Sequence, residues 1–557
     1  MKKAVGFSKL LAFTILPLAF LFGGCEAFFP GNGSEPCIDN LDCSLGEVCD
    51  LEKGRCVPVD TPKPLSVVDL ELTPSVDSDA AATQVPTVDL SQLDPEQMPL
   101  QVAAAVQLGG MVPSPDAMGG IPGTLVATRQ PGFDNRSLIF NIPVGDSGEY
   151  ESRLTAGTYD LLFKPTNRDN FPQLLLSGLE LPADEEPYLG YHGFANPEKD
   201  DLTDQDPLLV VRGRVLQSQV YANPVTGMKI EGITDQGLRT SVAVPDQQGI
   251  FYLRLPFSRS VVTDGQYDDA FPQTMDVTIR PCSSDVMQPT VTVEGVELDD
   301  HELGTFYVGE VSDLRSVSGV VLDSRGRPVA NCTLRFESNE IGNGVLTHQT
   351  RSDSSGEYEA SLPEGNYVVT AVPELLSEAR MHSTELELAE DKVSNIQLPD
   401  KLILTGTLVD HEGNPAADVV VRAKRLSAVS GEEDGVIRTY ETITSAGGVF
   451  NLFVDHGRYS VSFIPSPASG LARSLPKVAY ILDDYQMESS AIRLPEPSLI
   501  KGNVYDAKGT PMCGVNIEVF YSPDENNSHL IGQTISGGNL EECTGAYSMI
   551  IPGQNLQ

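Results

Sequence analysis

The side chains with the most distinctive chemistry in this 557-residue chain are its nine cysteines. Cys37, Cys43, Cys49 and Cys56 fall in one short stretch with too few apolar residues to build a core. Such thiols either form disulfides or bind zinc, but zinc sites usually contain a C-x2–4-C pair, and these gaps span five, five and six residues. We therefore expect disulfides in residues 25–60, with a zinc knuckle as the alternative.

The residue types that enzymes use for catalysis have no recognisable arrangement. The pairs His301-Glu302 and His411-Glu412 lack the second histidine of an H-E-x-x-H zinc site. The sequence also contains no G-x-S-x-G nucleophile elbow and no phosphate-binding loop. The seven histidines are scattered: His192, His301, His348, His382, His411, His456 and His529. We expect no catalytic residues and no enzyme activity.

The N-terminus has the layout of an export signal. Lys2 and Lys3 are basic, and the apolar run from Leu10 to Phe22 is too short to cross a bilayer. The next residues, Leu21-Phe22-Gly23-Gly24-Cys25, resemble the bacterial lipobox, which implies that residues 1–24 are removed and that Cys25 carries a lipid. Lipidation of Cys25 also leaves an even number of cysteines, as expected in an oxidising compartment. The alternative is an ordinary secretory signal.

The residues after Cys25 indicate where the chain is held. Glu26 is not the aspartate that resembles an inner-membrane retention signal, which favours the outer membrane. The stretch from Cys37 to Cys56 resembles the small cysteine-rich module that follows the anchor in many deltaproteobacterial, especially myxobacterial-type, lipoproteins. We expect a lipid-anchored protein of the cell envelope at the outer membrane, on its periplasmic or surface face.

Charge excludes one class of partner. The chain has 37 basic and 78 acidic residues, a net charge of -41, and it lacks the clustered Lys and Arg that nucleic-acid binding needs. The acidic stretch Glu198–Asp206 could hold calcium through carboxylate oxygens, although it lacks the EF-hand glycine. A solvated acidic linker is the alternative, and we expect no other cofactor.

Residues 61–99 are rich in Pro, Ser, Asp, Thr and Ala, with only brief apolar pairs such as Val67-Val68. This composition predicts a disordered linker that carries the rest of the protein away from the membrane.

The remainder of the chain repeats one pattern. In its clearest copy, strand residues lead to the turn Asp323-x-x-Gly326-x-Pro328, and Cys332, Leu334 and Phe336 then face one side of the returning strand. The copy continues with a D-x-x-G-x-Y turn and a G-x-Y strand. Further copies include turns at Asp410-x-x-Gly413-x-Pro415 and Asp506-x-x-Gly509-x-Pro511. In one copy the closing strand is delayed to Met275–Ile279, and we expect the insert before it to be a loop.

These phrases resemble the carboxypeptidase regulatory-like domain, a transthyretin-like antiparallel β-sandwich, from about Leu208 to the end. The resemblance implies an all-β fold of tandem sandwiches, arranged as a string. We expect modules at residues 100–197 (diverged), 207–311, 312–400, 401–496 and 497–557. The last copy stops before its G-x-Y strand, so either the sequence is truncated or something outside it completes that module.

The positions of the remaining cysteines in the repeat predict whether each thiol is buried or paired. Cys332 aligns with the inward-facing Val419 and Val515, so we expect a buried apolar thiol. Cys513 and Cys543 both lie in turns of the last module, and we expect them to form a disulfide. Cys282 has only Cys332 as a candidate partner, and that pairing would need a contact between modules.

The sequence therefore favours a non-catalytic cell-envelope lipoprotein, a multi-domain stalk for display, adhesion or protein and ligand interaction. The resemblance implies adhesion, spacing or ligand display, which is a weak guide to activity. The alternative is an accessory subunit of an envelope hydrolase or transport system. The membrane is the expected partner through the lipid. A protein or glycan ligand is open, although the chain has no tryptophan to stack on a sugar.

Overall fold

The computed structural model describes residues 47–50, 55–58, 64–75, 78–114, 119–130, 137–169, 171–182, 188–189, 210–220, 222–256, 258–262, 266–282, 289–298, 302–309, 314–339, 344–427, 436–487, 491–524, 527–539 and 542–553. Their regular elements are β-strands, with two short 3-10 helices at Leu90–Gln92 and Pro467–Ser469. The expected all-β fold of tandem antiparallel sandwiches is confirmed. Buried apolar side chains form five cores, and we number the five modules around them in chain order.

Module 1 (residues 106–189) packs a three-stranded sheet, β12-β6-β9, against the strands β8-β7-β10-β11. Its strands are β6 (Val106–Met111), β7 (Gly123–Gln130), β8 (Ile139–Val144), β9 (Glu149–Leu154), β10 (Gly157–Pro165), β11 (Leu174–Leu181) and β12 (Tyr188–Leu189).

Module 2 (residues 210–309) packs β15-β13-β20 against β14-β18-β19. Its strands are β13 (Val210–Leu216), β14 (Met228–Thr234), β15 (Ile250–Arg254), β16 (Ser258–Val262), β17 (Gln266–Ala270), β18 (Thr274–Pro281), β19 (Thr290–Glu297) and β20 (Glu302–Tyr307). The sequence predicted that the insert before β18 is a loop, and this prediction is wrong. The insert contains the hairpin β16-β17, and β16 pairs in parallel with β11, because the edge of module 1 offers unpaired backbone groups.

Modules 3 (residues 314–398) and 4 (residues 402–494) share one plan. Module 3 contains β21 (Leu314–Leu322), β22 (Thr333–Ser338), β23 (Val345–Arg351), β24 (Glu357–Pro363), β25 (Gly365–Val372), β26 (His382–Leu388), β27 (Lys392–Val393) and β28 (Ile396–Gln397). Module 4 contains β29 (Leu402–Val409), β30 (Val420–Ser427), β31 (Thr439–Ile443), β32 (Val449–Val454), β33 (Gly457–Ile464), β34 (Lys477–Ile481), β35 (Tyr485–Gln486) and β36 (Ile492–Arg493). In each, the first strand pairs in parallel with the closing strands.

The repeated phrases act as local structural devices. In module 3 the Asp323 carboxylate accepts hydrogen bonds from the backbone N–H of Arg325 (2.9 Å) and Arg327 (2.8 Å), which closes the first turn. Gly326 has φ 77°, a left-handed conformation that glycine adopts without strain. On the returning strand, Cys332, Leu334 and Phe336 are fully buried, as the alternation predicted.

Module 5 combines strands from the N-terminal part of the chain with strands from its C-terminal part. Its C-terminal strands are β37 (Pro497–Tyr505), β38 (Asn516–Asp524), β39 (Asn527–Ile535), β40 (Gly537–Asn539) and β41 (Glu542–Pro552), and its N-terminal strands are β3 (Val67–Thr73), β4 (Thr83–Asp89) and β5 (Leu100–Gln101). The two sheets run β39-β38-β3-β4 and β40-β41-β37-β5. The prediction that residues 61–99 form a disordered linker is therefore wrong, and so is the start of module 1 at residue 100.

The N-terminal strands take the places of strands that module 3 supplies from its own sequence. Strand β5 pairs in parallel with β37 through Leu100 and Val504, as β28 does with β21. The Tyr547 hydroxyl donates to the carbonyl of Met98 (2.8 Å), while the corresponding Tyr358 donates to Ser394 (2.6 Å). The strands that the last module lacks thus come from within the chain, and the expectation of an external partner is also wrong.

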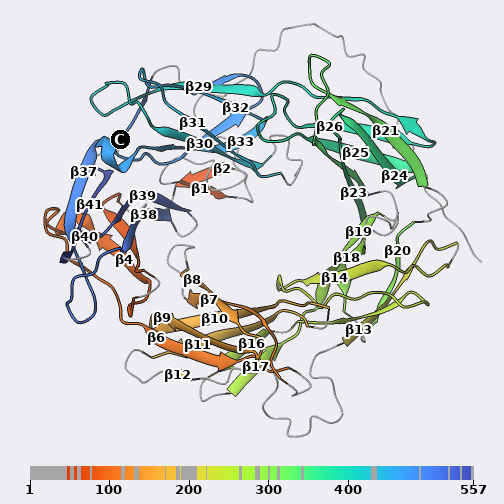
Figure 1. Ribbon diagram of the computed structural model, residues 1–557, viewed down its shortest axis with the longest axis horizontal. Coiled ribbons are helices and arrows are strands. Elements are labelled where there is room, and N and C mark those ends of the chain that lie inside the picture. The colour runs from red at the N-terminus through yellow and green to blue at the C-terminus, as the bar shows by residue number, and fades with distance from the viewer. Residues whose placement is uncertain are drawn as a thin grey trace, which may run out of the picture.

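Each module contacts the next, and the series closes on itself (Figure 1). Figure 1 shows β4, from the start of the chain, beside β38 and β39 from its end. The junctions include β11–β16 pairing, β19–β23 pairing, a Met381–Asp455 hydrogen bond of 2.8 Å, an Arg473–Leu530 hydrogen bond of 3.4 Å and an Arg153–Asp79 ion pair of 2.7 Å. The modules form a closed ring, not the open string expected from sequence.

Candidate functional site

The N-terminal site residues predicted from sequence are described only in part. Residues 1–24, Cys25, Cys37, Cys43 and the acidic stretch 198–206 lie outside the described residues. Cys49 and Cys56 are opposite each other in the pairing of β1 (Glu47–Asp50) with β2 (Arg55–Pro58). The structure therefore places the backbones of two of the four clustered cysteines side by side.

The four cysteines of the sandwich modules are found in three different states. Cys513 and Cys543 form a disulfide in module 5, between the two turns where pairing was expected. Cys332 is fully buried in the core of module 3, where burial raises the pKa of its thiol to about 12. Cys282 is an exposed, unpaired thiol, so no bond joins it to Cys332.

The polar residues of the repeats are used in structural hydrogen bonds. Hydrogen bonds from backbone N–H groups, that of Arg327 foremost, hold the pKa of Asp323 below its usual value. The Tyr367 hydroxyl donates to the carbonyl of Pro363 (2.6 Å), and Tyr459 makes the same bond to Asp455 (2.9 Å). These recurring positions of the repeat therefore fix turns and strand ends, because their donors and acceptors are already satisfied.

The histidines within the described residues are dispersed over modules 3, 4 and 5. Burial lowers the pKa of His348, which lies in β23. In the part of the chain that the structure describes, no group of three or more His, Cys, Asp or Glu side chains is placed to hold a metal ion. None of the helices there has the length and apolar character needed to cross a membrane.

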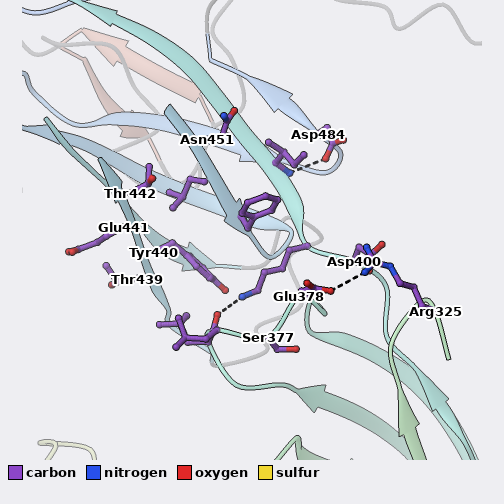
Figure 2. A pocket seen from close by; sticks show the side chains of 16 residues that line it. Arg325, Ser377, Glu378, Asp400, Thr439, Tyr440, Glu441, Thr442, Asn451 and Asp484 are labelled. Atoms are coloured by element: carbon purple, nitrogen blue, oxygen red, sulfur yellow. Dashed lines mark hydrogen bonds and ion pairs between the residues drawn. The ribbon is translucent and has the colours of Figure 1, made fainter. Parts of the chain in front are cut away.

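A groove of about 1140 Å³ lies between modules 3 and 4 and is the site that the sequence did not predict (Figure 2). Module 3 contributes a loop with Ser377 and Glu378, and module 4 contributes residues of β31 and β32. The lining consists of Arg325, Leu375, Leu376, Ser377, Glu378, Asp400, Lys401, Ile403, Thr439, Tyr440, Glu441, Thr442, Asn451, Leu452, Phe453 and Asp484.

Edge strands form the module 4 side of this groove. Strand β31 ends the sheet β31-β30-β33-β34, and β32 ends the sheet β32-β29-β35. None of the described strands pairs with the outer edge of β31. Figure 2 shows Tyr440, Glu441 and Thr442 along this side, with Asn451 at one end of the groove and Arg325 at the other.

A buried lysine forms part of the groove wall. Lys401 donates a hydrogen bond from Nζ to the carbonyl of Leu375, and its Nζ lies 5.3 Å from the centroid of the Tyr440 ring. Burial lowers the pKa of Lys401, although the charge of Asp455 opposes this effect. The lysine thus joins the loop of module 3 to strand β31, and its charge is engaged by the protein itself.

A buried carboxylate holds the two modules together behind the groove. Asp455 is fully buried and accepts hydrogen bonds from the Met381 N–H (2.8 Å), the Tyr440 hydroxyl and the Arg438 guanidinium (3.1 Å). Arg438 also donates to the carbonyl of Pro373 in module 3. Because a buried charge is costly unless it is paired, this network fixes the relative position of the two modules.

The rim of the groove combines exposed apolar side chains with acidic ones. Leu376 is 95% exposed and Phe453 is 58% exposed. Four lining residues are acidic (Glu378, Asp400, Glu441 and Asp484) and two are basic (Arg325 and Lys401). Glu378 and Glu441 are also paired with arginines outside the lining, Arg327 and Arg422, so Asp400 and Asp484 are the lining carboxylates without an ion pair among the described residues. The groove therefore presents both apolar and acidic side chains to solvent.

Comparisons with known proteins show what one module of this chain is similar to. No curated protein matches the chain. A streptococcal ancillary pilin is 11% identical over 51% of this chain and 98% of its own length, with a TM-score of 0.22. The minor pilin of Streptococcus agalactiae is 17% identical over 33% of this chain and 96% of its own, with a TM-score of 0.23. The Bacillus anthracis TIE protein is 12% identical over 78% of this chain and 74% of its own, with a TM-score of 0.16. TM-scores this low carry no argument about assembly or function. The family profile of the carboxypeptidase regulatory-like domain matches residues 316–399, so module 3 is similar to that domain.

Proposed function

We propose that this chain is a non-catalytic lipoprotein of the cell envelope, anchored through Cys25, that binds another protein on a rigid ring of sandwich modules. The observation that carries the proposal is the closure of module 5 by residues 65–102. A string joined by single linkers leaves its modules free to reorient. A closed ring holds surfaces from neighbouring modules in one arrangement, which lowers the entropic cost of binding a partner across a junction.

The use of the repeated polar residues supports a binding role over catalysis. Asp323, Tyr367 and Tyr459 already satisfy backbone groups, and the buried Asp455 already has three donors. A catalytic acid or base needs a proton that it can exchange with a substrate. The groove between modules 3 and 4 instead presents backbone edges and apolar side chains, which are features of protein recognition.

The anchor is tested by replacing its thiol. Cys25→Ser should abolish labelling of the chain by an alkyne-tagged fatty acid and shift the chain from the membrane fraction to the soluble fraction. Cys282→Ser is the matched control, because Cys282 is exposed and unpaired, and it should change neither result. Continued labelling of the Cys25→Ser chain would overturn the proposed anchor.

Ring closure is tested by a cross-link between its two ends. Glu71 and Glu518 are opposite each other in β3 and β38, so Glu71→Cys with Glu518→Cys should form a disulfide in cells. The resulting loop should migrate faster on a non-reducing gel, because the unfolded chain is then held in a large circle. Glu71→Cys alone is the control. Equal mobility of the single and double variants would contradict the ring.

Surface proteolysis of intact cells with mass spectrometry then separates display from a periplasmic role. Release of fragments from modules 2 to 5 would support display on the cell surface. Full protection would overturn display and favour the alternative of an accessory subunit in the periplasm.

A further inference from the structure

We propose that the groove between modules 3 and 4 binds an extended, cationic peptide segment of a partner protein, which adds as an antiparallel strand to the outer edge of β31. The proposal rests on the proposed function and names the class of partner. It is carried by three observations: the position of β31, the way the equivalent strand is covered in module 3, and the charge of the groove.

The register of β31 determines which backbone groups face the groove. The Arg438 carbonyl accepts from the Arg425 N–H (2.8 Å), and the Thr444 N–H donates to the Val419 carbonyl (2.9 Å), so the even-numbered residues bond to β30. In an antiparallel ladder the bonding direction alternates along the strand. The N–H and C=O groups of Thr439, Glu441 and Ile443 therefore point outward, where an added strand would meet them.

The same molecule shows what covers such an edge elsewhere. Strand β23 has in module 3 the place that β31 has in module 4, since each pairs with the returning strand and precedes a glycine turn. Strand β19 of module 2 pairs antiparallel with β23, with Thr290 opposite Thr347 and Thr292 opposite Val345. This pairing joins modules 2 and 3 into one seven-stranded sheet. At the next junction the corresponding edge borders an open groove instead.

The groove selects the chemistry of the added strand. Side chains alternate between the two faces of a strand, so every second residue of the peptide would lie near the exposed Leu376 and Phe453. The intervening residues would meet a lining in which Glu378 and Glu441 are already paired with arginines, which leaves Asp400 and Asp484 as its carboxylates without an ion pair among the described residues. In addition, both basic residues of the lining already have partners within the protein: Lys401 donates a hydrogen bond to the Leu375 carbonyl, and Arg325 forms an ion pair with Glu378 (3.3 Å). A segment that alternates apolar residues with Lys or Arg fits these surroundings, and strand addition with side-chain selection is a common mode of peptide recognition.

The test uses a short fluorescein-labelled peptide in which valine alternates with lysine, titrated with the full-length protein and followed by fluorescence anisotropy. The matched peptide in which valine alternates with glutamate should bind at least about tenfold more weakly, because like charges oppose its approach. Backbone amides of Thr439, Glu441 and Ile443 should become protected from hydrogen exchange when the lysine peptide binds.

Two variants of one residue separate strand addition from simple charge attraction. Glu441→Pro removes an outward N–H at an edge position where proline is tolerated, and it should weaken lysine-peptide binding by about tenfold or more. Glu441→Ala removes the carboxylate and its ion pair with Arg422 but keeps the N–H, so it should weaken binding by less than about threefold.

Equal binding by the Glu441→Pro and wild-type chains would overturn the proposal, as would equal affinity for the two peptides or no binding of the lysine peptide. Fractionation of cells carrying Cys25→Ser reports on the anchor independently. A failure of peptide binding with an intact anchor and ring would reject this site alone.

Discussion

The strongest consequence of the ring is that a single residue of the N-terminal segment should control the stability of the C-terminal module. Leu70 of β3 is 1% exposed and lies opposite Val519 of β38, which is also buried. Leu70→Ala would leave a cavity between them, and a buried Leu→Ala change typically costs about 2–5 kcal/mol. At about 1.4 kcal/mol for each factor of ten, the protecting equilibrium of module 5 should weaken roughly 30-fold to several thousandfold.

Hydrogen exchange followed by mass spectrometry measures this effect locally, which matters because a chain of several modules need not unfold in one step. Exchange of amides in β37, β38 and β41 should accelerate in the Leu70→Ala chain, while that in module 3 should not change. Leu93 lies in the same segment but is 39% exposed, so Leu93→Ala is the control and should change the free energy of unfolding by less than about 0.5 kcal/mol. If the two variants exchange alike in β38, residues 65–102 do not complete module 5 and the reasoning fails.

Three further changes probe separate parts of the ring. Asp455→Ala should destabilise the junction of modules 3 and 4 by about 3–5 kcal/mol, because it leaves the Arg438 guanidinium buried without its carboxylate partner. Amide hydrogen exchange in residues 373–381 measures this loss, and an unchanged exchange rate would refute the prediction. Cys332→Val should reduce alkaline destabilisation: the raised pKa of the thiol makes module 3 lose stability as the pH rises from about 9 to about 12, since only the unfolded chain ionises readily in this window. Urea unfolding at neutral and alkaline pH tests this, with identical pH dependence of variant and wild type as the contrary result. Cys513→Ser with Cys543→Ser should cost module 5 about 2–4 kcal/mol, and unchanged exchange in β41 would contradict that value.

The repeat itself was readable from the sequence because its signals are local. An Asp-x-x-Gly turn needs only the Asp carboxylate, two nearby N–H groups and a glycine with positive φ, all within five residues. The alternation that buries Cys332, Leu334 and Phe336 is likewise a property of one strand. The disulfide of module 5 followed from the same alignment, because both of its cysteines occupy repeat turns.

The closing segment was missed because its signal is short and its partners are remote. Val68, Leu70 and Leu72 alternate as a buried strand should, but Pro, Ser and Asp dominate the surrounding composition. Three alternating residues are compatible with a strand or with a linker. The strand becomes stable only when β38, more than 400 residues later, provides the other half of the ladder.

The sequence by itself determined the module type, the turns and the inward positions, since these depend on residues close together in the chain. The anchor at Cys25 stays a prediction from the sequence. Tertiary structure decided how the modules are joined: residues 65–102 complete module 5, β19 covers β23, and β31 is left at the edge of a groove. The unpaired N–H and C=O groups of an edge strand can bond to any extended segment that reaches them. Which segment pairs with a given edge depends on the positions of all five modules, and no local sequence pattern predicts that arrangement.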